Sequence, residues 1–296
     1  ALGIGKGDEV ITSPTSFIAT IGAITHIGAK PVFVDVKEDF NLDEEKIEEK
    51  INKKTKAIMP VHWTGRMCNM IKIRSIAKKY NLKIIEDAAQ GMGAFYNKVH
   101  AGSYSDVAAF STHPLKNLNA LGDGGFITTN NKKIYEKIKL FRNHGLKKRD
   151  YVESYGINSR LDVLNAEVLK IRLKKLKLIN SKRRRNVQIY RENLNASFIF
   201  IPEDKKKEIN SYVMFLIQAE KRNKLQEYLS KNKIQSLIYY GTPLHLQPAA
   251  KKLGYKRGAL PNSERLANKV LALPHHQNLS RKQILYVCNK INKFYN

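Results

Sequence analysis

The chain has 296 residues, of which 42% are hydrophobic, and it carries a formal net charge of +27. This length suffices for one large domain and a smaller one, each with a true core. No apolar run approaches the roughly 18 residues of a membrane span, and two cysteines make neither a disulfide framework nor a metal cluster. With no export signal, we expect a cytoplasmic protein without a membrane partner.

The surplus of lysine and arginine has two interpretations. It could bind nucleic acid, or it could cover solvated helix faces. The lysines recur along helical patterns without stacking aromatic residues between them, so we expect no nucleic-acid partner. The one dense cluster, residues 182–185, is expected to lie on a helix surface.

In the first half of the chain, apolar strands alternate with amphipathic helices. Strands are expected at residues 8–14, 30–36, 55–63, 82–89, 105–112 and 124–130, and helices at 16–28, 41–52, 69–81 and 131–145. This alternation indicates a three-layer α/β/α fold, in which helices cover both faces of a mainly parallel sheet.

The pattern changes in the second half. One long basic amphipathic helix is expected over residues 162–194. A strand at 210–220, a helix at 221–233, a strand at 234–240 and a helical end follow. We therefore expect a large domain over residues 1–185, which includes the start of the long helix, and a small α+β domain over residues 186–296.

Ligands of open parallel sheets bind beyond the carboxyl ends of the strands. The polar and aromatic residues at these ends are Ser16 and Phe17, then His62, Trp63 and Thr64, then Asp87 and Gln90, and finally Ser111, His113 and Lys116. They come from separate strands that should share one edge. They are therefore candidates for a single site.

Lys116 and Asp87 carry the chemistry in this set. A lysine in a dry loop loses hydration, its pKa falls, and its neutral amine can form a Schiff base. Asp87 closes an apolar run, where it either caps a following helix or partners a cation such as a protonated ring nitrogen. The bland alternative for Lys116 is an ordinary surface charge. A Schiff-base lysine, an acid for a pyridinium and the aromatic Phe17 together describe a pyridoxal phosphate (PLP) site.

At these residues the chain resembles a known family over nearly its whole length. The blocks are GDEVI, GAKPVFVDV, TKAIMPVH, IIEDAAQ, FSTHPLKNLNALGDGG, RNHG, YGINSRLD and PLHLQPA. Their order is similar to that of the DegT-type PLP-dependent sugar-nucleotide aminotransferases, members of the fold-type I aminotransferase superfamily. The lysine block together with EDAAQ is the most specific part of the resemblance.

The resemblance implies roles for four residues around the cofactor ring. Lys116 would hold PLP through a Schiff base and then move the proton between substrate and cofactor carbons. Asp87 would keep the ring nitrogen protonated, Gln90 would touch the phenolic oxygen, and Phe17 would stack on the ring face. Without the family, Phe17 reads equally well as a core residue of a helix.

Further residues are implied around the phosphate and the sugar. Ser111 would bind the phosphate, and Asn158 would reach the phosphate of the neighbouring subunit, so that a homodimer shares its active sites. From the residues alone, a turn or cap is the simpler interpretation of both. Substrate contacts are expected from His62, His113 and His245, with Trp63, Thr64 and Arg66 helping to set specificity. No metal site is expected, because the adjacent His275 and His276 have no further ligands at suitable spacing.

The chain departs from the family pattern at its start. The family has a phosphate-binding turn at a helix N-terminus ahead of its GDEVI block, and this chain begins after that point. Gly3, Gly5 and Gly7 do not replace the turn, because a strand follows them. We therefore expect a missing N-terminal segment, weak retention of PLP and an exposed apolar face.

The expected activity is transfer of an amino group to a keto carbon of a nucleotide-linked deoxysugar. Glutamate is the expected donor, and the product would be a precursor of cell-surface polysaccharide or glycoconjugate. One alternative is a PLP-dependent sugar dehydratase of the same fold, but those relatives carry histidine where this chain has Lys116. The other is a binding protein, either a nucleic-acid binder or a non-catalytic relative.

Overall fold

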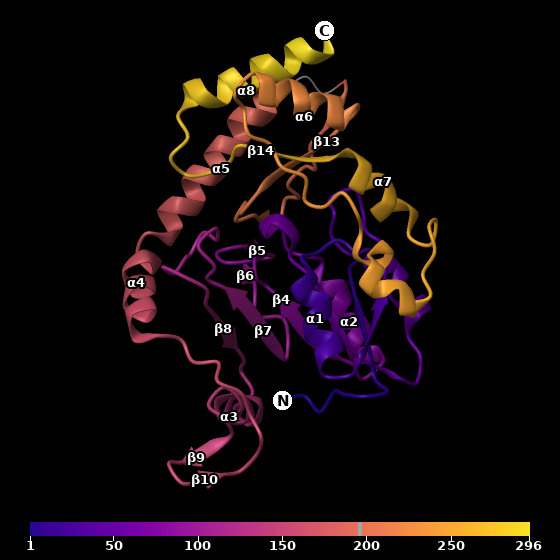
Figure 1. Cartoon of the computed structure of the whole chain (residues 1–296), viewed down its shortest axis with the longest axis vertical. Coiled ribbons are helices and arrows are strands. Elements are labelled where there is room, and N and C mark those ends of the chain that lie inside the picture. Colours follow the sequence, from indigo (N-terminus) through magenta and orange to yellow (C-terminus); the bar gives the residue numbers. More distant parts are fainter. Residues whose placement is uncertain (195–196) are drawn as a thin grey trace.

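The computed structural model describes residues 1–194 and 197–296. Its centre is a six-stranded sheet in the order β2-β1-β3-β4-β7-β8 (Figure 1). The strands are β1 (Glu9–Thr12), β2 (Lys30–Phe33), β3 (Thr55–Met59), β4 (Lys83–Asp87), β7 (Val107–Ser111) and β8 (Gly125–Thr128). Within this sheet β8 alone pairs antiparallel. The mainly parallel sheet and its six strands are therefore as the sequence predicts.

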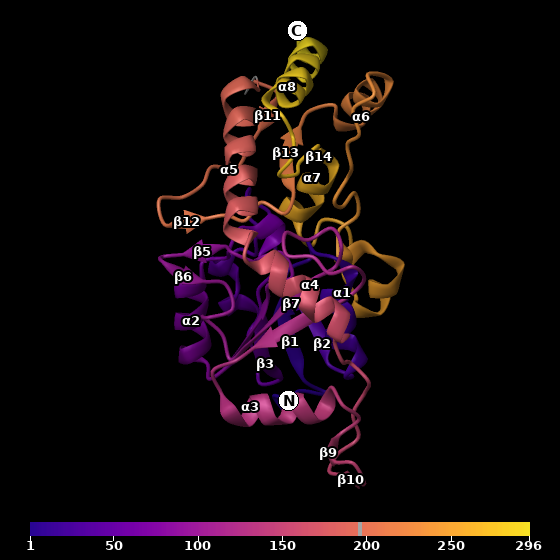
Figure 2. The same cartoon turned by 90° about the vertical axis from the view of Figure 1, so that its left-hand side faces the viewer.

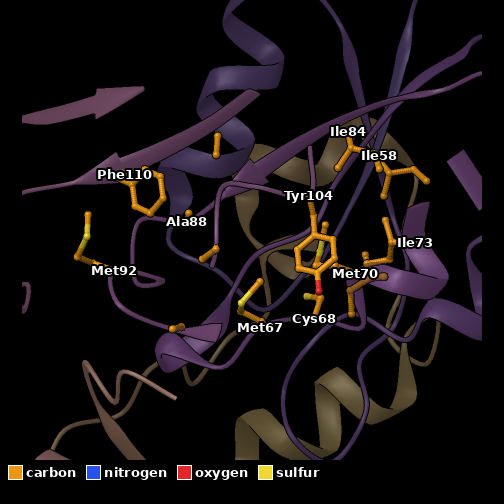
Figure 3. Packing of buried hydrophobic residues seen from close by; sticks show 14 of the residues in the cluster. Ile58, Met67, Cys68, Met70, Ile73, Ile84, Ala88, Met92, Tyr104 and Phe110 are labelled. Carbon is orange, nitrogen blue, oxygen red and sulfur yellow. The ribbon is translucent and has the colours of Figure 1, made fainter. Parts of the chain in front are cut away.

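Three helices of the first half were expected and are present. They are α1 (Ile18–His26), α2 (Met70–Lys79) and α3 (Lys132–Phe141). Helix α2 packs on β3 and β4. Figure 3 shows this contact, with Ile58 and Ile84 of the sheet beside Met70 and Ile73 of the helix in one buried cluster. Part of the core of the large domain thus lies between the sheet and α2.

The helix expected at residues 41–52 is wrong. Two short 3₁₀ helices stand there, η1 (Glu44–Lys46) and η2 (Glu48–Lys50). Leu42 and Ile47 are both fully buried. Five residues apart, they would lie about 140° apart around an α-helix, so one regular helix could not turn both toward the core.

The long helix expected over 162–194 is also wrong in its continuity. It is two helices, α4 (Val163–Leu173) and α5 (Leu176–Asn193), which break at Lys174 and Lys175. Figure 2 shows α5 rising from the large domain into the small one, whereas α4 lies at an angle across the large domain. Leu169 and Leu176 pack into the same core cluster on either side of the break.

The small domain is built on a three-stranded antiparallel sheet in the order β11-β13-β14. Its elements are β11 (Ile199–Phe200), β13 (Phe215–Ala219), α6 (Arg222–Lys231), α7 (Pro261–Lys269), β14 (Val270–Leu273) and α8 (Arg281–Tyr295). The strand expected at 234–240 is wrong, because only Leu237 of that segment pairs, in an isolated bridge with Ala272.

Short elements that the sequence did not indicate complete the fold. They are β5 (Phe95–Tyr96), β6 (Val99–His100), β9 (Leu146–Lys148), β10 (Tyr151–Val152), β12 (Glu208–Ile209), η3 (Trp63–Gly65), η4 (Leu244–Leu246) and η5 (Pro248–Leu253). Strand β12 pairs with β5 and so ties the entry of the small domain to the large one. Across the described ranges, the longest apolar helical stretch falls short of what a bilayer crossing requires.

The basic cluster at 182–185 does not lie wholly on a helix surface as expected. Arg183 is buried and donates to the backbone carbonyls of Tyr212 and Val213. Burial lowers the pKa of Arg183 to about 10. Arg184 also donates inward, to the carbonyl of Asn210. Part of the positive charge therefore attaches α5 to the small domain and is not available to a polyanion.

Candidate active site

The carboxyl ends of β1, β4 and β7 bring the candidate residues to one edge of the sheet. Strands β4 and β7 are adjacent and parallel, with Asp87 opposite Ala109. Lys116 follows β7 by five residues, and its charge interacts with that of Asp87. The two residues on which the predicted chemistry depends therefore follow adjacent strands at the same edge of the sheet, although 29 positions separate them in the sequence.

Lys116 lies half-buried in a loop that is anchored on both sides. Its backbone N–H donates to the carbonyl of His113 at 2.9 Å, and the next two residues, Asn117 and Leu118, are buried. Burial lowers the pKa of Lys116, and the nearby carboxylate of Asp87 partly opposes this shift. The direction agrees with the sequence prediction, and it increases the fraction of neutral amine.

Asp87 is held by hydrogen bonds to both carboxylate oxygens. Oδ2 accepts from the hydroxyl of Thr20 at 2.6 Å, and Oδ1 accepts from the backbone N–H of Ala89 at 3.2 Å. Residues 88–94 form turns and not a helix, so the helix-cap interpretation of Asp87 is wrong. The hydroxyl of Ser16 lies 2.6 Å from that of Thr20. Because the hydroxyl proton of Thr20 is donated to Asp87, the hydroxyl of Ser16 must donate to that of Thr20. The two hydroxyls together hold the carboxylate in place.

Phe17 stands at the start of α1 with 57% of its surface exposed. It is therefore not a core residue of the helix. The ring of Tyr240, from the small domain, lies 6.4 Å from that of Phe17 and 5.7 Å from that of Trp63. A narrow cleft is lined by residues 14–16 on one side and by Tyr239 and Tyr240 on the other. The aromatic face of Phe17 thus opens near the junction of the two domains.

Gln90 and Ser111 have partners that fix them near this edge. The side-chain oxygen of Gln90 accepts from the backbone N–H of Thr64 at 2.8 Å, and Gln90 is 7% exposed. The hydroxyl of Ser111, at the end of β7, accepts from the N–H of His113 at 3.2 Å. Both side chains belong to the turns that carry Asp87 and Lys116.

The expectation that His62 and His245 contact substrate is not supported by the structure. His62 is fully buried; its Nδ1 accepts from the N–H of Cys68, so its Nε2 donates to Glu86 at 2.7 Å. His245 is 1% exposed and lies 3.1 Å from Glu264. Neither ring faces solvent; both nitrogens of His62 are hydrogen-bonded, whereas Nδ1 of His245 has no partner.

Two other residues that were expected near the substrate, His113 and Arg66, differ from each other in exposure. His113 is exposed at the tip of the lysine loop, with Asp123 at 3.9 Å. Arg66 is 4% exposed and forms ion pairs with Asp204 and Glu208. Arg66 therefore joins the two domains and has no free charge for a substrate, whereas His113 remains accessible.

Asn158 lies on the surface, outside the group of residues around Lys116. It forms an isolated bridge with Asn143, and its side-chain oxygen accepts from Arg160. This single chain therefore does not itself bring Asn158 to the lysine.

Two of the three glycines after Lys116 are needed for close packing of the protein itself. A Cβ at Gly124 would lie 2.7 Å from the hydroxyl of Thr112, and one at Gly125 would lie 2.6 Å from the carbonyl of Phe110. Gly122 has open space around it. The close approach of β8 to β7 therefore requires glycine at positions 124 and 125.

Sequence reasoning missed the residues that support the site from behind. Thr20 lies in the first turn of α1, four residues after Ser16, and this spacing was the available signal. Tyr240 and Asn180 had no comparable signal, because only the fold brings these distant segments beside Phe17 and Asn117, respectively.

The residues present fit PLP. A desolvated amine at Lys116, a fixed carboxylate at Asp87 and an exposed aromatic face at Phe17 are the groups that an aldehyde, a ring nitrogen and a flat ring require. On the described residues, no group of three or more His, Cys, Asp or Glu is placed to hold a metal ion. Together with the mainly parallel sheet and the smaller α+β domain, these groups define the class: a PLP-dependent enzyme of fold type I.

Comparison with known proteins identifies the family within this class. Residues 1–292 match the model of the DegT/DnrJ/EryC1/StrS aminotransferase family, and the chain belongs to that family. It is therefore a PLP-dependent aminotransferase.

Two curated relatives are each 42% identical to the chain. One is a "pleiotropic regulatory protein" of Geobacillus stearothermophilus, matched over all of this chain and 80% of its own length. The other is the dTDP-3-amino-3,6-dideoxy-alpha-D-galactopyranose transaminase of Aneurinibacillus thermoaerophilus, matched over 99% of this chain and 81% of its own.

A solved structure is similar over almost the whole chain. It is the crystal structure of DesV from Streptomyces venezuelae in complex with a ketimine intermediate. The TM-score is 0.96 at 37% sequence identity, and the match covers 99% of this chain and 80% of that one. The fold predicted from the sequence is thus confirmed.

Proposed function

We propose that the protein transfers an amino group from glutamate to a keto carbon of a nucleotide-linked deoxysugar. The observation that carries the proposal is the half-buried amine of Lys116, whose pKa is lowered by burial beside Asp87. The similarity to a dTDP-sugar transaminase at 42% identity supports this substrate class. The products would serve as precursors of surface polysaccharides or glycoconjugates in the cytoplasm.

The chain's own residues divide the work. The chemistry that PLP supplies when bound is an aldehyde carbon for the amino group and a ring that delocalises the electron pair left on the substrate carbon. Lys116 Nζ would accept the proton from that substrate carbon and deliver it to the former aldehyde carbon of the cofactor. Asp87, which Thr20 fixes, would keep a proton on the ring nitrogen of the bound cofactor. Phe17 covers one ring face.

Three further assignments belong to this proposal. Gln90 orients the cofactor ring, Ser111 binds its phosphate, and His113, exposed at the loop tip, contacts the substrate. The large domain over residues 1–185 holds the cofactor, and the small domain over residues 186–296 closes over it. Two separate buried clusters, one around α2 and one around α5 and α8, favour this division.

We also propose a homodimer in which Asn158 reaches the phosphate in the second copy's site. Large apolar side chains are exposed on the lysine loop and on the segment from Ile157 into α4. These are Leu115, Leu121, Ile157, Val163 and Leu164, each at least 65% exposed. Exposed apolar surface of this kind marks protein contacts, and here it adjoins residues assigned to the site.

The experiment is a spectrum of the protein with PLP, followed by glutamate and then a dTDP-linked keto-deoxysugar. The visible absorption of the bound cofactor should disappear with glutamate and return with the sugar, as 2-oxoglutarate and an amino sugar form. Separate 3-keto and 4-keto sugars then identify the acceptor carbon. A protein that does not respond to PLP and glutamate would contradict the proposal. Lys116→Ala should bind the cofactor without the visible absorption of the wild type.

The dehydratase and non-catalytic alternatives are less favoured by the site. Lys116 stands where sugar dehydratases of this fold have histidine. Burial lowers the pKa of Lys116, and amino transfer requires the resulting neutral amine, whereas simple binding does not. A dehydratase would form a keto sugar that has lost a hydroxyl group, and no amino sugar, in the same experiment.

A further inference from the structure

A pair of buried asparagines lies directly behind the lysine loop. Asn117 follows Lys116, and its side-chain nitrogen donates to the side-chain oxygen of Asn180 at 2.7 Å and to the carbonyl of Ser211 at 2.8 Å. Asn117 and Asn180 are each 3% exposed, and Ser211 is fully buried. Both amide protons of Asn117 are thus used in bonds to segments far away in the sequence. We call Asn117 and Asn180 the amide pair.

The amide pair connects three other parts of the molecule to the lysine loop. Asn180 lies on α5 and donates to the carbonyl of Met92 at 3.0 Å. A Cβ at Gly93 would lie 2.2 Å from the Asn180 side-chain nitrogen, so glycine is required there. Ser211 donates through its hydroxyl to the carbonyl of Gln90 at 2.8 Å. The interdomain helix, the turn after Asp87 and the entry of the small domain therefore all meet beside Lys116.

Movement of the loop would carry a substantial cost. A buried donor that loses its partner costs about 1–3 kcal/mol, and a shift of Asn117 would leave two such donors unpaired. Residues 113–115, at the loop tip, are exposed, and their hydrogen bonds stay within residues 111–119. The amide pair is therefore placed to determine where the backbone of Lys116 lies.

We propose that Asn117 and Asn180 are positioning residues that hold the Lys116 amine in its partly dehydrated place beside Asp87. The inference rests on the proposed function, because it takes Lys116 as the reacting amine. Neither asparagine needs to touch substrate or cofactor. In their absence, the loop relaxes and water reaches the amine.

The expected effect is on the titration of Lys116 itself. Burial lowers the pKa of this amine, and Asp87 is the charged group that opposes the shift. Exposure to water should return the pKa toward its ordinary value, since the cost of desolvating the charged form is removed. The midpoint of the titration reports this change even without cofactor or activity.

The test uses the cofactor-free protein. It is labelled with a trace of acetic anhydride from about pH 6 to about pH 11, a range that brackets the ordinary lysine pKa, and the Lys116 peptide is quantified by mass spectrometry. In Asn180→Ala, the labelling midpoint of Lys116 should rise by about half a pH unit or more. Asn117→Ala removes the same bonds from the loop side and should raise it similarly.

Asn186→Ala is the matched control. Asn186 is a fully buried asparagine on the same helix, and its side chain donates to the carbonyl of His276 in the small domain. It should lower thermal stability without moving the Lys116 midpoint. Equal midpoints in wild type, Asn180→Ala and Asn117→Ala would overturn the proposal. So would failure of both variants to fold while Asn186→Ala folds, because the pair would then be purely structural.

The result is separable from the fate of the proposed function. If wild-type Lys116 does not bind PLP, the proposed function fails whatever the midpoints are. If wild-type Lys116 binds PLP and the midpoints do not move, only the positioning role fails.

Discussion

The hydrogen bond from Thr20 to Asp87 gives a quantitative test of the site. Valine in place of Thr20 keeps the shape of the side chain but removes the hydroxyl that donates to Asp87 Oδ2 at 2.6 Å. A hydrogen bond to a charged group contributes about 1.5–3 kcal/mol, and about 1.4 kcal/mol corresponds to a tenfold change in Kd. Because Asp87 would then be free to turn away from the ring nitrogen, the PLP affinity of Thr20→Val should fall about tenfold or more.

The assay is a titration of cofactor-free protein with PLP, followed by visible absorbance. Thr25→Val is the matched control, since Thr25 lies on the same helix and its hydroxyl donates to the carbonyls of Ile21 and Gly22, away from the site. Its affinity should match that of the wild type. If Thr20→Val binds PLP as tightly as the wild type, the hydroxyl does not fix Asp87 and this part of the reasoning is refuted.

Two predictions concern stability. Arg66→Met leaves the buried carboxylate of Glu208 with Lys205 as its remaining cation, so urea unfolding should show a loss of about 3 kcal/mol. Arg265→Met removes an exposed pair and should cost below about 1 kcal/mol. Equal losses in the two variants would contradict the prediction. Burial, with nearby Arg183, lowers the pKa of His275 from 6.5 to about 3. The unfolded chain therefore binds a proton that the folded one does not. Relative to His275→Gln, the free energy of unfolding of the wild type should be constant above pH 6.5. It should fall by about 1.4 kcal/mol per pH unit as the pH drops toward 3. Parallel curves of unfolding free energy against pH for the two proteins would disprove the prediction.

The sequence predicted the elements whose signal is local and repeated. Strands β1 to β4 are apolar runs bounded by turns, and α2 has an apolar stripe, so both follow from pattern alone. The break between α4 and α5 had no such signal, because neither proline nor glycine stands at Lys174 and Lys175. It follows from packing, since Leu169 and Leu176 reach one core from helices that run in different directions.

The site divides in the same way. Asp87 and Lys116 were predicted because chemistry restricts which residue types can follow those strands. The burial of His62 could not be predicted, since its partner Glu86 lies 24 positions away and the loop at residues 102–105 completes the network. Burial alone would raise the pKa of Glu86, but these hydrogen bonds outweigh it and hold the pKa below its usual value. Contacts between distant segments decide such cases, and a single sequence does not display them.

The position of the covalent bond to the cofactor tests the central claim most directly. The protein is loaded with PLP, reduced with borohydride and digested, and the modified peptide is identified by mass spectrometry. The account predicts one phosphopyridoxyl group per chain, on Lys116 among the many lysines of this sequence. A modification spread over several lysines, or concentrated on another one, would contradict it.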